Sequence, residues 1–305
     1  MPDIVLYDTT LRDGSQMEGI ALTVDDKLRI TEKLDELGID IIEGGMPGAN
    51  PKDFDYFQAV QDLPLQHAQI AAFGPTRRAG ILTEKDPNIQ ALLESDAPIV
   101  TLVGKSDIRH VVQVLETTLE ENLSMIEDSI RFLRDRGRRV IFDAEHFFDG
   151  YTADSVYALE TLLAAQRGGA RIVVLCDTNG GTLTTRMGRI IEEVHETIDA
   201  PFGIHAHNDA GVGVANSLIA VEMGASQVQG TFNGYGERCG NASFCSIIPN
   251  LELKMGKQSI GSDKLQDLVE FSRFLSEIAN AYHDHRQPYV GDSAFAHKGG
   301  AHIDG

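Results

Sequence analysis

The feature that most constrains the fold is a repeat of eight short apolar runs, each separated from the next by a segment of helical character. The runs are almost continuously apolar rather than alternating, as expected of parallel strands that are covered on one face and packed on the other. Strands that alternate with helices in this way predict a parallel sheet. The runs occupy residues 4–8, 39–45, 69–74, 98–104, 139–147, 171–178, 202–209 and 226–234.

The segments between the runs carry helical signals. In residues 118–137, leucine and isoleucine recur at steps of three and four, which is the spacing of one helix face. Residues 23–38 begin with Thr23 and Asp25 as possible N-terminal caps. After the last run, residues 263–283 predict one more helix.

Eight strand–helix units over about 240 residues match a (β/α)8 TIM barrel. The alternative is an open doubly wound sheet. No GxGxxG follows the first run, however, and the polar residues are spread over most strand ends instead of one crevice. We therefore predict an α/β protein with a TIM barrel over residues 1–260. We expect a C-terminal helix and the start of a linker subdomain over residues 261–305.

Composition narrows the class of protein. A net charge of −20, with no basic stripe apparent, argues against a nucleic-acid-binding protein. No apolar stretch approaches the ~20 residues of a membrane helix, and the first strand begins too early for a signal peptide. The three cysteines show no CxxC spacing, which fits a reducing compartment. We expect a cytoplasmic protein that captures anionic ligands through a metal or a buried arginine.

Ionisable and amide side chains gather where the predicted strands end. Barrels of this kind carry their chemistry at the carboxyl ends of the strands, so this concentration predicts a site rather than a solvated rim. Asp8 and Glu43 are expected either to orient other groups or to contact substrate. The residues at the strand ends include Asp8, Arg12, Asp13, Glu43, Lys105, Asp143, Glu145, Asp177, Thr178, His205, His207 and Asn233.

His205 and His207 form the sharpest local signal. Residues i and i+2 of a strand point to the same side, so the two imidazoles suit one divalent metal, although a structural pair is the alternative. Asp13, on the strand that neighbours the last one in a closed barrel, offers a carboxylate. Asn241, in the glycine-rich turn after the last strand, offers an amide oxygen or is only a turn residue. Two nitrogens and two oxygens favour Mn²⁺, Mg²⁺ or Zn²⁺ acting as a Lewis acid.

Several long motifs, in order along the chain, resemble the DRE-TIM metallolyases, the superfamily of isopropylmalate, homocitrate and citramalate synthases and HMG-CoA lyase. The motifs are DTTLRDGSQ (8–16), EGGMPGANPKD (43–53), GIHAHND (203–209) and NGYGERCGN (233–241). The resemblance covers essentially the whole chain. Three further stretches are more similar to citramalate synthases than to isopropylmalate synthases: GKSDIRH (104–110), FDAEHFFDGY (142–151) and VLCDTNGGTL (174–183).

The resemblance implies an acyltransferase that performs a Claisen-type condensation. Acetyl-CoA loses a methyl proton, the enolate attacks a 2-oxo acid, and the thioester is hydrolysed. In the citramalate synthase branch the 2-oxo acid is pyruvate and the product feeds isoleucine biosynthesis. The resemblance also implies a homodimer. Members of the family usually continue into linker subdomains and a regulatory domain. We expect the regulatory domain to be absent here and the chain to be insensitive to feedback.

The resemblance also implies a role for each site residue. Arg12 would stabilise the alkoxide that develops on the ketone oxygen, and Arg12–Asp13 as a buried structural ion pair is the alternative. Thr178 would bind the substrate carboxylate, and Arg12 and Asp13 are also expected to contact the substrate. Glu145 is an acid/base candidate, or it forms an ion pair with an arginine at the barrel mouth; His302 is a second acid/base candidate. The implied metal ligands are Asp13, His205, His207 and Asn241.

Two other activities remain open. A larger 2-oxo acid would make the protein an isopropylmalate or homocitrate synthase, and a retro-aldol cleavage would make it a lyase of the HMG-CoA type. The volume of the pocket near the second to fourth strands should separate the first two activities. We expect Met46, Phe73 and Leu102 to point into that pocket.

Overall fold

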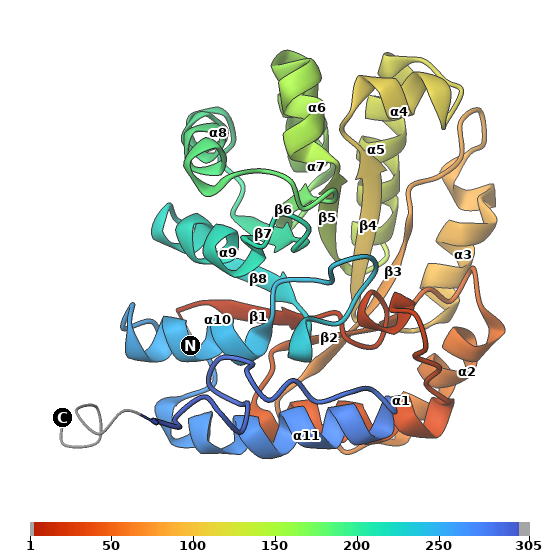
Figure 1. Ribbon diagram of the computed structural model, residues 1–305. Coiled ribbons are helices and arrows are strands. Elements are labelled where there is room, and N and C mark those ends of the chain that lie inside the picture. The colour runs from red at the N-terminus through yellow and green to blue at the C-terminus, as the bar shows by residue number, and fades with distance from the viewer. Residues whose placement is uncertain (1–2, 299–305) are drawn as a thin grey trace.

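The computed structural model describes residues 3–298 and shows eight parallel strands that close into a barrel (Figure 1). Each strand pairs with the next one in the sequence, and the last pairs with the first. The predicted TIM barrel is therefore confirmed. The strands are β1 (Val5–Asp8), β2 (Ile41–Gly45), β3 (Gln69–Pro75), β4 (Ile99–Lys105), β5 (Arg139–Glu145), β6 (Ile172–Asp177), β7 (Phe202–Ala206) and β8 (Gln227–Gly230).

Helices surround the barrel and connect its strands (Figure 1). Within residues 3–298, none is both long enough and apolar enough to span a bilayer. The α-helices are α1 (Val24–Leu37), α2 (Pro51–Ala59), α3 (Pro87–Glu94), α4 (Ile108–Gln113), α5 (Leu119–Arg134), α6 (Phe147–Ala153), α7 (Ser155–Gly168), α8 (Thr184–Thr197), α9 (Gly213–Glu222), α10 (Phe244–Leu253) and α11 (Leu268–Ile278). Short 3-10 helices are η1 (Gly14–Gln16), η2 (Val60–Asp62), η3 (Thr83–Lys85), η4 (Phe232–Gly234) and η5 (Ser262–Asp267).

The first helix begins and ends as its sequence predicts. The Thr23 hydroxyl accepts from the Asp26 backbone N–H, and the Asp26 carboxylate accepts in return from the Thr23 N–H, at 3.1 and 2.9 Å. This reciprocal cap satisfies two donors that would otherwise have no intrahelical partner. Asp25, the other predicted cap, does not take part. Gly38 ends the helix at φ 95°, a left-handed conformation that favours glycine.

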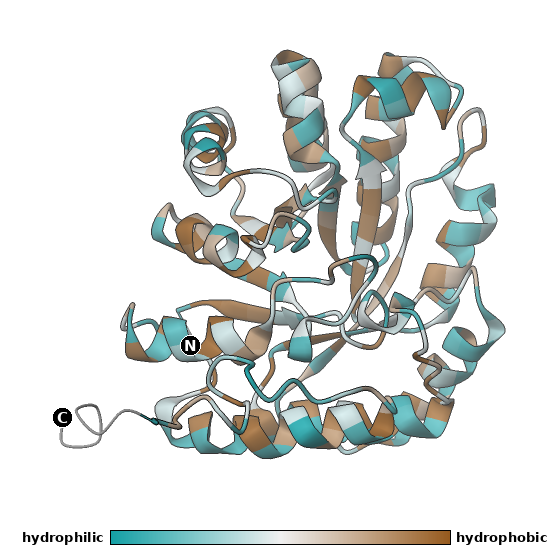
Figure 2. Cartoon of the chain, in the orientation of Figure 1, coloured by the Kyte–Doolittle hydropathy of each residue, from teal (hydrophilic) through white to brown (hydrophobic). Residues whose placement is uncertain are grey.

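The barrel encloses a small apolar layer and carries polar groups above it. Inward-facing side chains of six strands, β1 to β6, form this layer, and Figure 2 shows hydrophobic residues concentrated along the strands. Towards the carboxyl ends, the same inward positions become polar: Thr101 follows Ile99 by two residues, and Asp143 follows Ile141. The apolar layer is Tyr7, Ile41, Ala71, Ile99, Ile141, Val174 and Cys176.

Three strands end at least two residues earlier than their sequences predict. β5 ends at Glu145 because His146 turns into the left-handed region at φ 55°. β7 ends at Ala206, and His207 instead forms an isolated antiparallel bridge with Asn241. β8 ends at Gly230. Buried residues continue just past each end, among them Phe147, His207 and Phe232, so the composition there resembles that of a strand although the backbone does not continue the sheet.

The predicted helix over 263–283 is two elements, η5 and the shorter α11, which ends at Ile278. α11 lies beside α1 (Figure 1). The Arg29 guanidinium lies 5.8 Å from the centre of the Phe274 ring, and Lys264 donates to the Glu36 carbonyl at 2.8 Å. The predicted domain boundary near residue 260 stays a prediction.

Candidate active site

A cavity of about 70 Å³ lies at the carboxyl ends of the strands. Side chains from β3 to β7 and from the loop after β1 line it. Eight residues were given a catalytic, substrate-binding or metal-binding role from the sequence, and six of them line this cavity: all but Asn241 and His302. The lining residues are Arg12, Asp13, Phe73, Val103, Asp143, Glu145, Cys176, Thr178, His205 and His207.

Asp13, His205 and His207 form a buried cluster whose ligand atoms all lie within 4.8 Å of one another. The Nε2 atoms of the two histidines are 3.3 Å apart, and Asp13 Oδ2 lies 3.6 and 3.9 Å from them. Burial alone would raise the pKa of Asp13, but Arg12 and the two histidines outweigh it and lower that pKa to about 2. Burial and His205 together lower the pKa of His207 to about 4, against the opposing effect of Asp13. The cluster therefore offers a carboxylate and a neutral imidazole, the forms that bind metals.

Asn241 completes the set. Its Nδ2 donates to Asp13 Oδ1 at 3.1 Å and to the Tyr235 carbonyl at 3.0 Å. Its Oδ1 is buried and has no donor within the described part of the chain. An unpaired buried oxygen costs ~1–3 kcal/mol, and a cation is one way to satisfy it. The donor set and this unpaired oxygen both fit a divalent metal.

Arg12 is held from three sides. Its Nε donates to Glu43 at 2.6 Å, its Nη1 donates to Asp13 at 3.1 Å, and its guanidinium lies 3.9 Å from the centre of the Phe73 ring. Burial lowers the pKa of Arg12, but Glu43 and Asp13 raise it above its usual range, so the charge is retained. Arg12 is thus both a member of a buried ion pair and part of the cavity wall.

Glu43 is the orienting group for Arg12. Its carboxylate also accepts from the hydroxyls of Tyr7 and Thr9, so Glu43 is buried and fully engaged. Of the two roles expected for Glu43, contact with substrate and orientation of other groups, the geometry favours the second. Asp8 lies nearby and accepts from the backbone N–H and hydroxyl of Thr10 at 3.0 and 2.8 Å. Burial is the largest influence on the pKa of Asp8 and raises it to about 7.

Glu145 forms an ion pair with Lys105, which lies opposite it on β4. The partner is a lysine, not the arginine that was the alternative from the sequence. The Thr178 hydroxyl accepts from the His146 backbone N–H at 2.8 Å, which leaves the hydroxyl hydrogen available for an acceptor in the cavity. His302 lies outside the described residues.

The expectation that Met46, Phe73 and Leu102 point into the pocket is only partly correct. Phe73 lines the cavity, but Leu102 is fully buried in the layer between the strands and the helices. Val103, one residue further along β4, faces the cavity instead. Successive residues of a strand face opposite sides, so a shift of one residue exchanges the inner and outer faces. Met46 is half-buried and does not line the cavity.

Sequence reasoning gave no role to two buried polar residues beside the cluster. Gln229 of β8 lies opposite His205 in the strand register, and its Oε1 lies 2.9 Å from the His205 Nδ1. Asp143 accepts from Gln229 at 2.9 Å, and burial and Glu43 raise the pKa of Asp143 to about 8. The sequence signal that could have identified Gln229 is a polar glutamine at an inward-facing position of a buried strand.

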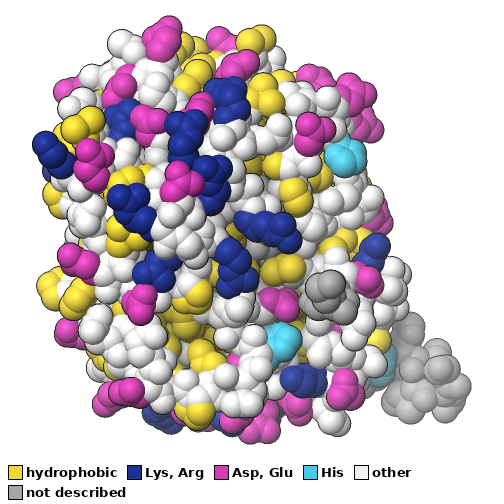
Figure 3. Space-filling model, turned by 180° about the vertical axis from the view of Figure 1, so that it is seen from behind, with side chains coloured by type: hydrophobic (Ala, Val, Ile, Leu, Met, Phe, Trp, Pro, Cys, Tyr) yellow, Lys and Arg dark blue, Asp and Glu magenta, His cyan; other side chains and the backbone are white. Residues whose placement is uncertain are grey.

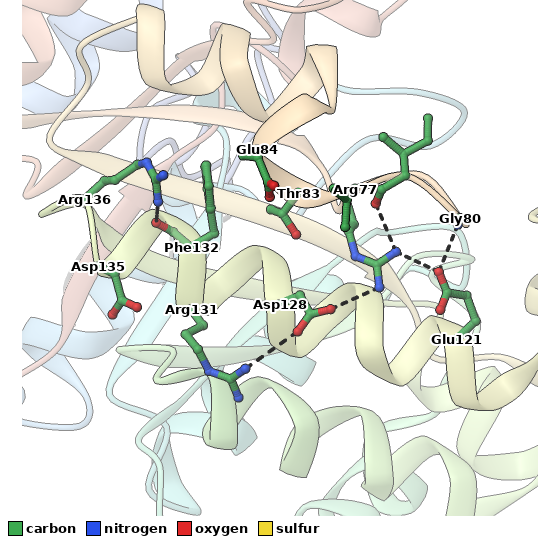
Figure 4. A pocket seen from close by; sticks show the side chains of 12 residues that line it. Arg77, Gly80, Thr83, Glu84, Glu121, Asp128, Arg131, Phe132, Asp135 and Arg136 are labelled. Carbon is green, nitrogen blue, oxygen red and sulfur yellow. Dashed lines mark hydrogen bonds and ion pairs between the residues drawn. The ribbon is translucent and has the colours of Figure 1, made fainter.

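A larger recess of about 540 Å³ lies outside the barrel, against α5 (Figure 4). Its central charged group is Arg77, which donates to Glu121 at 2.7 Å and to Asp128 at 3.1 Å. Figure 4 shows Arg77 between these two carboxylates. Its charge is therefore compensated within the protein, which favours a structural role for this recess.

Basic side chains do gather in one region, contrary to the absence of a basic stripe inferred from the sequence. Residues 131–139 contain five arginines. Figure 3 shows Lys and Arg side chains near the middle of the face opposite to that of Figure 1. Three of the five arginines have acidic partners: Arg131 pairs with Glu127, Arg134 with Asp135, and Arg138 with Asp96. Much of the local positive charge is therefore neutralised.

Comparison with known proteins gives relatives along nearly the whole chain. It is 54% identical to an (R)-citramalate synthase of Synechocystis over 98% of this chain and 56% of the relative. It is 34% identical to a probable 2-isopropylmalate synthase of Methanosarcina acetivorans, over 99% of this chain and 56% of the relative. The chain thus spans about half the length of these curated relatives.

The fold also matches solved structures. A crystal structure of an HMG-CoA lyase from Bacillus subtilis superposes with a TM-score of 0.77 at 19% identity, covering 92% of this chain and 96% of that one. At this identity the match supports the barrel fold alone. A family model described as HMGL-like matches residues 3–274. Because that match covers most of the sequence, the chain belongs to the HMGL-like family.

Proposed function

We propose that this chain is the catalytic barrel of an (R)-citramalate synthase, which joins acetyl-CoA to pyruvate and hydrolyses the thioester. One observation carries the proposal: Arg12, Asp13, His205 and His207 meet at a single small cavity at the carboxyl ends of the strands. The higher identity to a citramalate synthase than to an isopropylmalate synthase, 54% against 34%, supports this branch of the family.

Asp13, His205, His207 and Asn241 would hold a divalent metal ion. Mn²⁺ and Mg²⁺ suit the two oxygen ligands, and Zn²⁺ suits the two imidazoles. When bound, the metal would supply Lewis-acid polarisation of the ketone of the 2-oxo acid. The unpaired Oδ1 of Asn241 supports this assignment.

Arg12 would stabilise the negative charge that develops on the ketone oxygen as the new carbon–carbon bond forms. Its Nε and Nη1 are engaged by Glu43 and Asp13, while Nη2 has no partner within residues 3–298. A donor that is fixed before the reaction pays no reorganisation cost when charge appears. The stacking of the guanidinium on Phe73 adds to this fixation.

Glu145 would remove a methyl proton from acetyl-CoA, leaving the enolate that attacks the ketone carbon of pyruvate. The adjacent Lys105 ammonium forms an ion pair with this carboxylate and directs it. Thr178 would donate its free hydroxyl hydrogen to the substrate carboxylate. Water then hydrolyses the thioester and releases the CoA thiol. His302 is a second acid/base candidate in this proposal.

The small cavity supports pyruvate as the 2-oxo acid. Phe73 and Val103 form the apolar part of its wall, beside the polar cluster. The substrate side chain is expected to meet these two residues. A methyl group needs less room there than an isopropyl group does.

The test is the initial rate of CoA release from acetyl-CoA, with Mn²⁺ or Mg²⁺, over a panel of 2-oxo acids. We expect the rate with pyruvate to be far above the rate with 2-oxoisovalerate. Equal rates would overturn the choice of substrate. Incubation with HMG-CoA tests the lyase alternative: formation of acetoacetate would replace the synthase proposal.

The proposal extends to a cytoplasmic homodimer with a role in isoleucine biosynthesis. Cys176 and Cys245 are free, buried thiols, which supports a reducing compartment. The homodimer rests on the family resemblance, and light scattering coupled to size-exclusion chromatography tests it. A monomer across the micromolar range would contradict this part of the proposal.

A further inference from the structure

A hydrogen-bonded link crosses the interior of the barrel and ends on one metal-ligand candidate. The His205 Nδ1 and the Gln229 Oε1 lie 2.9 Å apart, and Gln229 Nε2 donates to Asp143 Oδ1 at 2.9 Å. Gln229 belongs to β8 and Asp143 to β5, two strands that do not pair with each other. Gln229 is fully buried and Asp143 almost fully, at 3% exposed.

The orientation of the Gln229 amide decides which nitrogen of His205 carries the proton. An amide oxygen can only accept, so a Gln229 oxygen that faces Nδ1 requires Nδ1 to carry a hydrogen. The neutral ring then has its lone pair on Nε2. That nitrogen is the one that lies 3.6 Å from Asp13 and 3.3 Å from His207 Nε2.

Asp143 holds the amide in the orientation that the structure shows. Its Oδ1 accepts from the Gln229 NH2 group and thereby keeps the amide oxygen directed at His205. If the amide were reversed, its NH2 group would face Nδ1, and the proton of the ring would move to Nε2. Such a ring could not present Nε2 to a metal.

We propose that Gln229 and Asp143 are positioning residues of the metal site: Asp143 fixes the amide of Gln229, and the amide oxygen holds His205 with Nδ1 protonated and Nε2 free to bind the ion. This inference rests on the metal site that the proposed function requires. Groups that hold the second nitrogen of a ligand histidine typically contribute ~10–100-fold to metal affinity.

Gln227 provides a matched control within the same strand. It lies two residues before Gln229, points to the same side of β8 and is also fully buried. Both of its side-chain polar atoms lack a partner within the described residues. Gln227 and Gln229 therefore share strand, face and burial, and only Gln229 contacts His205.

The test compares Gln229→Met with Gln227→Met, and Asp143→Leu with Asp143→Asn, in the full chain. Methionine preserves side-chain length, and asparagine preserves the acceptor for the Gln229 NH2 group. The first readout is the ¹⁵N NMR spectrum of the histidine rings in metal-free protein, with His205→Gln used to assign the signals. The second readout is the dissociation constant for Mn²⁺, measured by calorimetry.

We expect His205 in the unaltered chain to be protonated on Nδ1. Gln229→Met and Asp143→Leu should lose this preference and bind Mn²⁺ about 10–100-fold more weakly. Gln227→Met and Asp143→Asn should retain the preference and the affinity. If Gln229→Met fails to fold, the comparison of the two Asp143 variants carries the test.

Two results would overturn the inference. One is a His205 ring protonated on Nε2 in the unaltered protein, which a reversed amide beside a protonated Asp143 would produce. The other is equal Mn²⁺ affinity in Gln229→Met and Gln227→Met. Failure of the unaltered chain to bind any divalent metal would count against the proposed function, and the NMR readout would still decide the orientation of His205.

Discussion

The Nε2 atoms of His205 and His207 lie 3.3 Å apart although the two residues have different backbone settings. His205 is part of β7, whereas His207 follows the end of that strand and is held by its bridge to Asn241. Burial and His205 keep the pKa of His207 at about 4, so a shared proton is disfavoured at neutral pH. A cation between the two nitrogens and the Asp13 carboxylate is the arrangement that satisfies all three groups.

Mn²⁺ should therefore stabilise the folded protein. A ligand that binds only the folded state contributes ~2.7 kcal/mol at a concentration of 100 times its dissociation constant. We expect Mn²⁺ to raise the melting temperature in scanning calorimetry and EDTA to reverse the rise. His207→Ala should lose the effect, while His195→Ala, at an exposed position of α8, should keep it. A full Mn²⁺ effect in His207→Ala would contradict this site.

Arg12→Lys should abolish turnover while the metal still binds. The arginine uses two nitrogens to contact Glu43 and Asp13 and has a third to offer the substrate oxygen, whereas lysine has one nitrogen on a flexible stem. We expect the rate of CoA release to fall by at least about 100-fold, the typical effect of losing one preorganised donor. Mn²⁺ affinity by calorimetry should change little.

Arg167→Lys is the matched control for this change. Arg167 is an exposed arginine of α7 that pairs with Glu127 at 3.0 Å, so the same substitution there should leave the rate unaltered. Substantial residual turnover in Arg12→Lys would show that a point charge suffices and that the planar guanidinium is not needed.

Much of the fold could be predicted from the sequence because its strands are marked by composition. Runs such as residues 171–178 are apolar on both faces, which is typical of a covered parallel strand. The ends of the strands were harder to predict. His207 is as buried as His205 of the strand, so composition alone does not show that His207 leaves the sheet.

Val103→Ala should relax the choice of 2-oxo acid. Val103 faces the cavity beside Phe73, so its loss provides space where the substrate side chain is expected. A change of one or two methyl groups in such a pocket typically alters discrimination by ~1–3 kcal/mol. We expect kcat/KM for 2-oxoisovalerate to rise about 10-fold relative to that for pyruvate, measured by CoA release.

Leu102→Ala separates pocket shape from core packing. Leu102 faces the layer between the barrel and its helices, so this variant should lose ~2–5 kcal/mol of unfolding free energy in urea titrations. Its relative activity on the two 2-oxo acids should stay unchanged. A shift in substrate preference in Leu102→Ala alone would reverse the assignment of inner and outer faces.

The site could be predicted only in part, because a motif identifies its members but not their partners. Arg12, Asp13, His205 and His207 stand out as polar groups at strand ends. Contacts such as that between Gln229 and Asp143 depend on how eight strands are staggered around the barrel. That register is set by packing over the whole sheet, and a shift of one residue would turn Gln229 away from His205.

Glu145→Gln should lower kcat while the metal site stays intact. Loss of a general base typically costs ~10²–10⁴-fold in rate. The glutamine has nearly the same shape and can still contact Lys105, so Mn²⁺ affinity and the melting temperature should change little. A rate within a factor of about three of the unaltered protein would assign proton removal elsewhere, with His302 as the next candidate.

Asp8→Asn should make stability less dependent on pH between about pH 4 and pH 7. In the folded protein, burial raises the pKa of Asp8 to about 7, whereas the carboxyl ionises near ~3.9 in the unfolded chain. Between these values the unfolded chain releases a proton that the folded protein retains. The contribution of Asp8 to stability is therefore fully present below about pH 4 and is lost as the pH rises to about 7.

The size of this effect follows from the difference between the two pKa values and is on the order of 4 kcal/mol. Asparagine cannot ionise, and its oxygen can still accept from the Thr10 backbone N–H. The variant should therefore gain stability relative to the unaltered protein as the pH rises from 4 to 7, with no further gain above that. Urea unfolding of both proteins in EDTA, at one-unit pH intervals, measures the difference, and a difference that does not vary with pH would show that Asp8 is ionised in the folded state.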